Sequence, residues 1–223
     1  MAALTGHTVS RQEAPFPAPL DYGRARQLLY FRRMFDLIAG VPGDVVECGV
    51  YRGNTLLMLC YHAREEGSKR HIWGFDSFEG FAPPSAEDQS IRPKRAGDLD
   101  PGVDPVWILE LLLNSGLDRE WVLANVSLVK GFFDQTLAKY RGDGIALLHL
   151  DVDLYAAYKT ALVELYDRVV PGGLILFDEY LGGLDQVNWP GAQIAIDECL
   201  GSRGGLVPVR DHSSGKYFLK KPS

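Results

Sequence analysis

Short apolar runs alternate with longer segments of helical periodicity along the 223 residues of this chain. Over residues 21–38, apolar side chains recur at the spacing of an amphipathic helix, which Gly40 and Pro42 end. The segment 44–50, DVVECGV, is instead a short apolar run that ends at glycine, as expected for a buried strand. The same patterns predict helices over 21–38, 54–67, about 105–115, 118–124, 154–169 and about 190–200, and strands over 44–50, 71–77, 126–132, 145–151, 174–180, about 205–210 and about 216–220.

The alternation of strands and helices predicts an α/β fold with a mostly parallel sheet. Two strands flank the helix 54–67 within about thirty residues, which is the length of a βαβ unit. The uninterrupted apolar runs 145–150 and 174–177 indicate central strands that are buried on both faces. We expect the Pro-Gly-Gly sequence at 171–173 to end the helix that precedes the fifth strand.

Two segments lack this periodicity. Residues 1–20 contain three prolines and are expected to form a flexible N-terminal arm. Residues 78–104 are rich in proline, glycine, serine and charge, and such a long connection is usually a lid or a binding loop. We therefore predict one domain over 21–223 with a lid insertion at about 78–104, because the chain has the length of a single decorated domain.

The composition is that of an ordinary globular protein, with 46% hydrophobic and 23% charged residues. The formal net charge of −6 disfavours nucleic acids and acidic lipids and leaves cations and small molecules as the expected partners. Three separated cysteines without a CxxC pair argue against a disulfide framework and a zinc site. No apolar run approaches the roughly 18 residues of a membrane helix, and the first residues do not resemble a secretory signal, so we expect a cytoplasmic protein.

The residues after the first two strands predict a nucleoside site, because ligands of open α/β sheets bind beyond the carboxyl ends of the strands. Gly49 and Gly53 bracket a tight turn in which backbone can approach a ligand closely. Tyr51 stands where a phosphate-binding GxGxxG motif would have a glycine, and Glu47 suits a positively charged ligand. Asp76 ends the second strand, where a carboxylate can accept both ribose hydroxyls. Together these positions favour an adenosine-containing ligand, whereas each alone is also consistent with a structural turn or a helix cap.

Four carboxylates follow the fourth and fifth strands: Asp151, Asp153, Asp178 and Glu179. Neighbouring parallel strands would bring them to one edge of the sheet, where such a cluster is costly without a cation. Oxygen ligands favour Mg²⁺, Mn²⁺ or Ca²⁺ over zinc. Asp153 also precedes a helix and suits an N-cap. Asp178 and Glu179 point to opposite faces unless the strand turns between them.

Histidine and aromatic residues near these positions have both structural and functional interpretations. His149 lies within an apolar strand, where a histidine is more often packed in the core than catalytic, and it is also a candidate general base. Phe132 and Phe133 follow Gly131 after the third strand and would pack either against an adenine ring or in the core. Trp189 precedes a Pro-Gly pair that is typical of a helix start, and we interpret it as structural.

Four segments, in this order, resemble the macrocin and mycinamicin O-methyltransferase family: VVECGVYRGNT, GFDSFEG, LHLDVDLY and PGGLILFDEY. The likeness covers about residues 25–200, and the combination is more specific than any single motif. It implies a class I methyltransferase, with a Rossmann-like, doubly wound, mostly parallel seven-stranded sheet and helices on both faces. It also implies S-adenosylmethionine as cofactor, Mg²⁺ as metal and a hydroxyl of a sugar or other natural product as methyl acceptor.

The resemblance further implies roles for single residues. The turn that holds the methionine part of the cofactor matches Glu47, Gly49, Val50, Arg52 and Gly53, and the ribose segment matches Asp76 and Ser77. The expected cofactor-binding residues are Glu47, Gly49, Tyr51, Gly53, Asn54, Thr55, Asp76, Ser77, Phe78, Gly131, Phe132 and Asp151. The expected metal ligands are Asp151, Asp178 and Glu179, where the last replaces the family's usual aspartate. The expected catalytic residues are Asp151, as general base, and His149.

Other functions stay open. A nucleotide-dependent oxidoreductase is disfavoured by Tyr51 at the glycine position and by the carboxylates. A methyltransferase-like binding subunit without catalysis is consistent with the departure at Glu179, and a C- or N-methyltransferase would not obviously need the metal. The expected partner is a small-molecule hydroxyl acceptor. The family tends to form dimers or larger assemblies, so we also expect a homo-oligomer.

Overall fold

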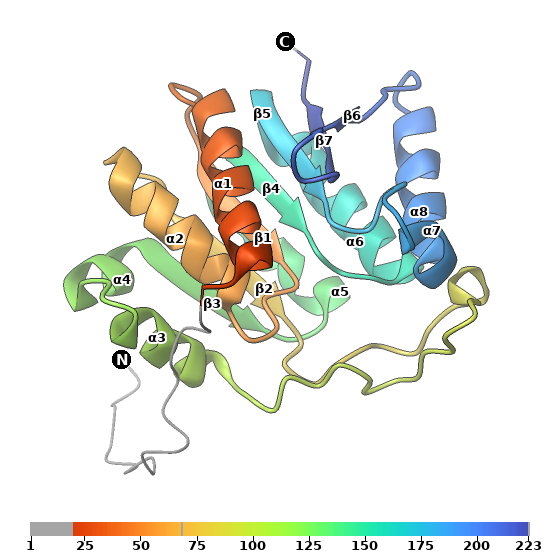
Figure 1. Cartoon of the computed structure of the whole chain (residues 1–223), viewed down its shortest axis with the longest axis horizontal. Coiled ribbons are helices and arrows are strands. Elements are labelled where there is room, and N and C mark those ends of the chain that lie inside the picture. Colours follow the sequence, from red (N-terminus) through yellow and green to blue (C-terminus); the bar gives the residue numbers. More distant parts are fainter. Residues whose placement is uncertain (1–19, 68, 223) are drawn as a thin grey trace.

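The computed structural model describes residues 20–67 and 69–222, which are built around one seven-stranded sheet (Figure 1). Apart from Leu20, the expected N-terminal arm lies outside the described residues. The strands are β1 (Asp44–Cys48), β2 (Ile72–Asp76), β3 (Val126–Lys130), β4 (Ile145–Leu150), β5 (Val169–Phe177), β6 (Val209–Arg210) and β7 (Tyr217–Lys220). Their order is β3-β2-β1-β4-β5-β7-β6; β1 to β5 are parallel, and β7 runs antiparallel to β5 and β6. The predicted α/β class and mostly parallel sheet are therefore confirmed.

Helices cover both faces of the sheet (Figure 1). One face carries α1 (Tyr22–Leu37), α2 (Asn54–Glu66), α3 (Pro105–Asn114) and α4 (Arg119–Asn125), and the other carries α5 (Phe133–Thr136), α6 (Tyr155–Leu165) and α8 (Pro190–Gly201). Short elements complete the chain: α7 (Asp185–Asn188) and 3-10 turns at Ala86–Asp88, Leu137–Lys139 and Tyr166–Arg168. None of the helices in the described parts of the chain is both long and apolar enough to cross a lipid bilayer.

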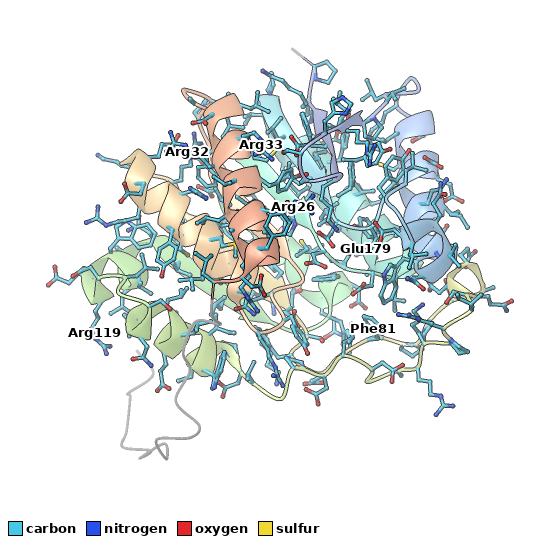
Figure 2. All side chains as sticks on the ribbon, in the orientation of Figure 1. Arg26, Arg32, Arg33, Phe81, Arg119 and Glu179 are labelled. Atoms are coloured by element: carbon cyan, nitrogen blue, oxygen red, sulfur yellow. The ribbon has the colours of Figure 1, made fainter. Side chains whose placement is uncertain are left out.

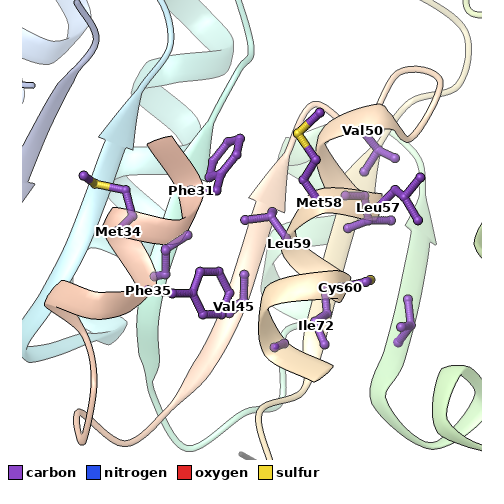
Figure 3. Packing of buried hydrophobic residues seen from close by; sticks show 14 of the residues in the cluster. Phe31, Met34, Phe35, Val45, Val50, Leu57, Met58, Leu59, Cys60 and Ile72 are labelled. Atoms are coloured by element: carbon purple, nitrogen blue, oxygen red, sulfur yellow. The ribbon is translucent and has the colours of Figure 1, made fainter. Parts of the chain in front are cut away.

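Two hydrophobic cores lie on opposite sides of the sheet, because successive strand residues point to opposite faces. Val45 belongs to the core under α1 and α2, whereas its neighbour Val46 belongs to the core under α6 and α8. Figure 3 shows Phe31 and Phe35 of α1 in the first core. The fully buried β4 strand contributes to both cores, which confirms the prediction from its uninterrupted apolar run.

The start of β5 differs from the expectation that the Pro-Gly-Gly sequence ends a helix. Helix α6 already ends at Leu165, and β5 begins at Val169, before the proline. The pairing of β4 with β5 shifts between Ile145 and Leu147, so residues 170–173 form an irregularity in which the missing proline N–H is tolerated. The amide of Gly172 then donates to the carbonyl of Lys221, which ties this irregular part of β5 to the chain after β7.

Side chains of helix α1 form hydrogen bonds with the turn of the β6–β7 hairpin, which forms one edge of the sheet. The Arg33 guanidinium donates to both carboxylate oxygens of Asp211, at 2.9 and 3.3 Å. Arg26 donates to the carbonyls of Ser213 and Ser214 in the same turn (Figure 2). Burial raises the pKa of Asp211, but hydrogen bonds from Ser214, Arg33 and Ser213 outweigh that effect and hold the pKa well below its ordinary value. The hairpin is therefore fixed by a charged contact that needs an ionised Asp211.

We expect Asp211→Asn to lower the free energy of unfolding at pH 7 by about 1.5–3 kcal/mol, the range for hydrogen bonds to charged groups. Because the folded-state pKa is depressed, this contribution is complete above the unfolded pKa of about 4 and fades as the pH falls below it. Urea unfolding at pH 7, 5 and 3.5 should therefore show a difference from wild type that is constant between pH 7 and 5 and smaller at pH 3.5.

The matched control is Asp36→Asn, because Asp36 pairs with Arg32 on the same helix but both side chains are more than half exposed (61% and 56%). An exposed pair contributes about 0.5 kcal/mol or less. Equal losses in the two variants at pH 7 would contradict a structural role for Asp211.

Candidate active site

A cavity of about 760 Å³ lies at the carboxyl ends of the parallel strands, where the sheet order reverses between β1 and β4. A second hollow of about 370 Å³ adjoins it, and both are lined by Gly49, Tyr51 and Asp151. Predicted site residues on the wall of the larger cavity are Gly49, Tyr51, Asp76, Ser77, Phe132, Asp151, Asp178 and Glu179. Asn54 and Thr55 line the smaller hollow, together with Arg24 and Gln27 of α1. Five predicted residues lie on neither wall: Glu47, Gly53, Phe78, Gly131 and His149.

Gly49 brings the turn after β1 into contact with the chain that leaves β4. The Asp151 amide donates to the Cys48 carbonyl at 3.0 Å, and Gly49 has a φ of +92°. A Cβ atom at Gly49 would collide with the Asp151 carbonyl. This position therefore needs glycine for two reasons, its left-handed backbone and the close approach of Asp151.

Asp76 organises the turns after β1 and β2. Its carboxylate accepts the amide of Tyr51 at 2.7 Å and the amide of Phe78 at 2.6 Å. Burial raises the pKa of Asp76, and these backbone hydrogen bonds oppose the shift. Asp76 also lines the cavity, and a carboxylate has about four acceptor sites, so the amides of Tyr51, Phe78 and Val50 leave capacity for a ligand hydroxyl. The structural-turn and ligand-binding interpretations of Asp76 are thus compatible.

Four non-glycine residues just beyond the strands have left-handed backbone. They are Tyr51 (φ 50°) after β1, Phe78 (φ 53°) after β2, Asp153 (φ 60°) after β4 and Leu181 (φ 49°) after β5. Such a conformation costs about 1–2 kcal/mol for an L-residue. The backbone strain of these turns is thus concentrated at the edge of the sheet that forms the cavity.

Glu47 and His149 form a buried pair across β1 and β4. The Nδ1 atom of His149 lies 3.1 Å from Oε1 of Glu47, and the two residues are 2% and 0% exposed. Burial raises the pKa of Glu47, and the hydrogen bond from His149 opposes this shift. The second carboxylate oxygen of Glu47, Oε2, has no hydrogen-bond partner among the described residues. The edge of the Phe31 ring packs on the His149 ring, with centroids 5.3 Å apart.

The remaining carboxylates converge at the ends of β4 and β5. One donor atom each from His149, Asp151 and Asp178 lies within 4.8 Å of the other two. Glu179 lines the cavity and is not in this group; its Oε2 atom accepts the Tyr158 hydroxyl at 2.8 Å and the Asp153 amide at 3.3 Å, and a side-chain hydrogen bond joins it to Asp178. The group of three donors within 4.8 Å therefore includes His149, whereas the set expected from the sequence includes Glu179.

Asp153 does not cap helix α6. The residue before the helix is Leu154, and the Tyr155 amide donates to Asp88 of the lid at 2.8 Å. Burial and the negative charge of Asp178 raise the pKa of Asp153 to about 7. The N-cap interpretation of Asp153 is therefore wrong, and the lid takes this role because Asp88 reaches the helix from another part of the chain.

Lys216 is a cation at this site that the sequence analysis missed. Its Nζ atom lies 2.8 Å from Oδ2 of Asp178 and donates to the Asp178 carbonyl at 2.8 Å. Burial would raise the pKa of Asp178, but the Lys216 ammonium holds it below its ordinary value. The antiparallel pairing of Phe177 with Tyr217 places Lys216 opposite Asp178. Only the register between these two strands, which are far apart in the sequence, could have predicted this contact.

The lid carries aromatic residues to the cavity. Phe81 of the lid and Trp189 at the start of α8 line the cavity and meet edge to face, with ring centroids 6.0 Å apart. The lid ammonium of Lys94 lies 4.2 Å from the Trp189 ring centroid. Figure 2 shows Phe81 on the lid, below Glu179 in this view, and both residues line the cavity. Trp189 marks the helix start as expected and also forms part of the cavity wall, which its local sequence did not indicate.

A family model described as macrocin-O-methyltransferase (TylF) matches residues 23–189. The chain belongs to this family. The match begins in α1 and ends at Trp189, so it includes every strand end that forms the cavity. The family assignment inferred from the four sequence motifs is therefore confirmed.

Named relatives of this TylF-family protein act in natural-product biosynthesis. A Streptomyces olivaceus protein named 8-demethyl-8-(2,3-dimethoxy-alpha-L-rhamnosyl)-tetracenomycin-C 4'-O-methyltransferase is 33% identical over 83% of this chain and 63% of its own length. The mycinamicin III 3''-O-methyltransferase of Micromonospora griseorubida is 30% identical over 63% of this chain and 56% of its own length. The chain thus spans about three fifths of these relatives. The crystal structure of CalS11, a calicheamicin methyltransferase, superposes with a TM-score of 0.76 at 25% identity, over 90% of this chain and 80% of that one.

We expect Gly49→Ala to lower the free energy of unfolding by about 2–5 kcal/mol, since left-handed alanine and the collision with Asp151 add together. Gly67→Ala is the matched control, because Gly67 has a φ of +66° but open space where a Cβ atom would lie. The control should lose only about 1–2 kcal/mol. Urea unfolding of both variants gives the comparison, and equal losses would refute the close approach of Gly49 to Asp151.

Proposed function

We propose that this protein transfers the methyl group of S-adenosylmethionine to a hydroxyl of a sugar or another small natural product, with the help of a bound divalent cation. The observation that carries the proposal is the cavity in which Asp76, Asp151 and Asp178 all take part. Asp76, which would bind the nucleoside, and Asp151 and Asp178, which would bind the cation, thus line the same cavity. Methyl transfer requires this proximity, because the cofactor and the acceptor must be bound side by side.

The cofactor would extend across both hollows. Asp76 and Ser77 lie where the ribose would bind, and Phe132 and Phe133 offer aromatic faces for the adenine. The methionine part would reach the smaller hollow, whose polar wall includes Asn54, Thr55 and Arg24. Gly49 and Asp151 lie on both walls and therefore at the junction, where the sulfonium group would be placed.

The carboxylates fit a divalent cation. Asp151 and Asp178 follow adjacent strands, line the cavity and offer oxygen donors within reach of one ion. Glu179, the third ligand implied by the resemblance, lines the same cavity. The resemblance implies Mg²⁺ as the ion. When bound, such a cation lowers the pKa of the acceptor hydroxyl and orients it.

In the proposed mechanism, Asp151 removes the acceptor proton. Within the described residues, no hydrogen bond reaches its carboxylate, which is free to accept one from a ligand in the cavity. The acceptor oxygen would form its new bond to the methyl carbon while the carbon–sulfur bond breaks. The electron pair of that bond stays on sulfur, the hydroxyl proton passes to Asp151, and S-adenosylhomocysteine remains. The buried His149, whose Nδ1 is already bonded to Glu47, is less accessible to the acceptor.

Names of relatives and the lid together support a sugar acceptor. The name of the tetracenomycin relative specifies a rhamnosyl group. In this protein, Phe81, Pro83 and Trp189 give the cavity an apolar side, which suits the C–H face of a sugar ring. A non-catalytic binding subunit and a C- or N-methyltransferase are the outcomes against which the proposal is tested. A homo-oligomeric state and a cytoplasmic location stay predictions.

We expect Asp151→Asn to reduce methyl transfer by about 10²–10⁴-fold, because a positioned base contributes that much, while the Kd of S-adenosylhomocysteine stays within about threefold. Turnover is followed as S-adenosylhomocysteine release with a panel of rhamnosides, and binding by calorimetry in Mg²⁺ and in EDTA. Asp36→Asn, far from the cavity, is the matched control and should change neither. Equal loss of turnover and binding would contradict the assigned role of Asp151. Absence of S-adenosylhomocysteine binding to the wild-type protein would refute the proposed function.

A further inference from the structure

The smaller hollow beside the main cavity has an arginine on its wall whose side chain is unpaired. Arg24 of α1 lines this hollow, and its guanidinium makes no hydrogen bond or ion pair with the described residues. We propose that Arg24 binds the carboxylate at the methionine end of the cofactor, so that α1 forms part of the cofactor site. This inference rests on the proposed function for the identity of the cofactor.

The other three arginines of α1 already have partners within the protein. Arg26 donates to carbonyls of the β6–β7 turn, and Arg32 and Arg33 each pair with an aspartate. For Arg24, only the backbone amide is bonded, to the Asp21 carboxylate at 2.8 Å. Within the described part of the chain, its side-chain N–H donors are therefore free for a ligand. Their planar, forked arrangement matches the two oxygens of a carboxylate.

A contact between α1 and α2 places Arg24 at the hollow. The Gln27 side chain of α1 donates to the hydroxyl of Thr55, at the start of α2, at 3.2 Å, and both residues line the hollow. Arg24 precedes Gln27 by three residues, so the two side chains share one face of the helix. The bonds from Arg26 to the hairpin turn also hold this end of α1. The position of Arg24 is therefore set by its neighbours on the helix and not by a partner of its own.

The charges on the wall of the smaller hollow suit the two charges of an amino acid. The methionine end of the cofactor carries an ammonium and a carboxylate. Asp21 and Asp151 line the hollow and can attract the ammonium, whereas the carboxylate needs a positively charged partner, since losing water without one is costly. Among the described residues that line this hollow, the positively charged ones are Arg24 and Arg52.

Arg52 is less suited than Arg24 to bind the carboxylate, because the lid already engages it. Its Nε atom donates to the Pro101 carbonyl at 3.0 Å, and its guanidinium lies 5.7 Å from the centroid of the Tyr51 ring. Arg52 is also exposed, whereas Arg24 is half-buried. Because water screens an exposed charge more strongly, a carboxylate gains more from Arg24. Arg24 is thus the cation that remains for the methionine end of the cofactor.

Calorimetric titration of the full-length protein in Mg²⁺ with two ligands tests the assignment. S-adenosylhomocysteine carries the carboxylate, and its decarboxylated analogue lacks that group alone. We expect Arg24→Gln to raise the Kd of S-adenosylhomocysteine by about 10–100-fold, which is the effect of losing a hydrogen bond between two charged groups. The Kd of the decarboxylated analogue should change by less than about threefold, because this ligand has no carboxylate to pair with Arg24.

Two further variants separate the effect of charge from a change of structure. Arg24→Lys keeps the positive charge but loses the forked donors, so it should recover part of the lost affinity. Arg32→Gln is the matched control, because Arg32 lies on the same helix and pairs with Asp36 at the surface, and it should leave both Kd values unchanged. Equal weakening of the two ligands by Arg24→Gln would overturn the proposal, as would an unchanged Kd of S-adenosylhomocysteine.

The two proposals fail in different ways. If S-adenosylhomocysteine binds to the wild-type protein but Arg24→Gln does not discriminate between the two ligands, the inference on Arg24 is wrong and the proposed function stands. If S-adenosylhomocysteine does not bind to the wild-type protein, the proposed function is wrong and the inference on Arg24 falls with it.

Discussion

Several carboxylates, buried or half-buried, gather at one edge of the sheet, and this is the constraint that the surrounding structure has to meet. Three of them have a partner from a different part of the fold: Glu47 has His149 of β4, Glu179 has Tyr158 of α6, and Asp178 has Lys216 beside β7. The contacts of α1 with Asp211 hold the hairpin that carries Lys216. Helix α1 and the β6–β7 hairpin are thus connected to the carboxylates of the cavity by charged hydrogen bonds. The carboxylate of Asp151 accepts no hydrogen bond from the described residues and faces the cavity.

Close backbone approach at the point where the sheet order reverses complements this charge arrangement. Gly49 lets the chain that leaves β1 touch the chain that leaves β4, and Asp76 fixes the neighbouring turn through two backbone amides. Both features position Asp151 without using its side chain. Asp151 and Asp76 can therefore share one wall while their geometries are set independently, which is the preorganisation that the proposed methyl transfer would require.

Most of the fold followed from periodicity, because each helix has one apolar face and each central strand is buried on both faces. The β5 boundary did not, since a Pro-Gly-Gly sequence that ends helices also fits a strand irregularity. The convergence of Asp76, Asp151 and Asp178 was predictable from their positions at strand ends. Lys216, Trp189 and the contact of Glu179 with Tyr158 were not predictable, because they depend on the register of β7, the path of the lid and the placement of α6.

The left-handed residues at the strand ends have a consequence for laboratory evolution. Glycine at Tyr51 or Leu181, whose side chains are exposed, would relieve backbone strain without removing a buried side chain. A selection for heat resistance alone would thus find some of its easiest gains in the turns that shape the cavity. Those gains would come with looser turns, so variants chosen for thermal tolerance should lose ligand selectivity at the cavity before they lose their fold.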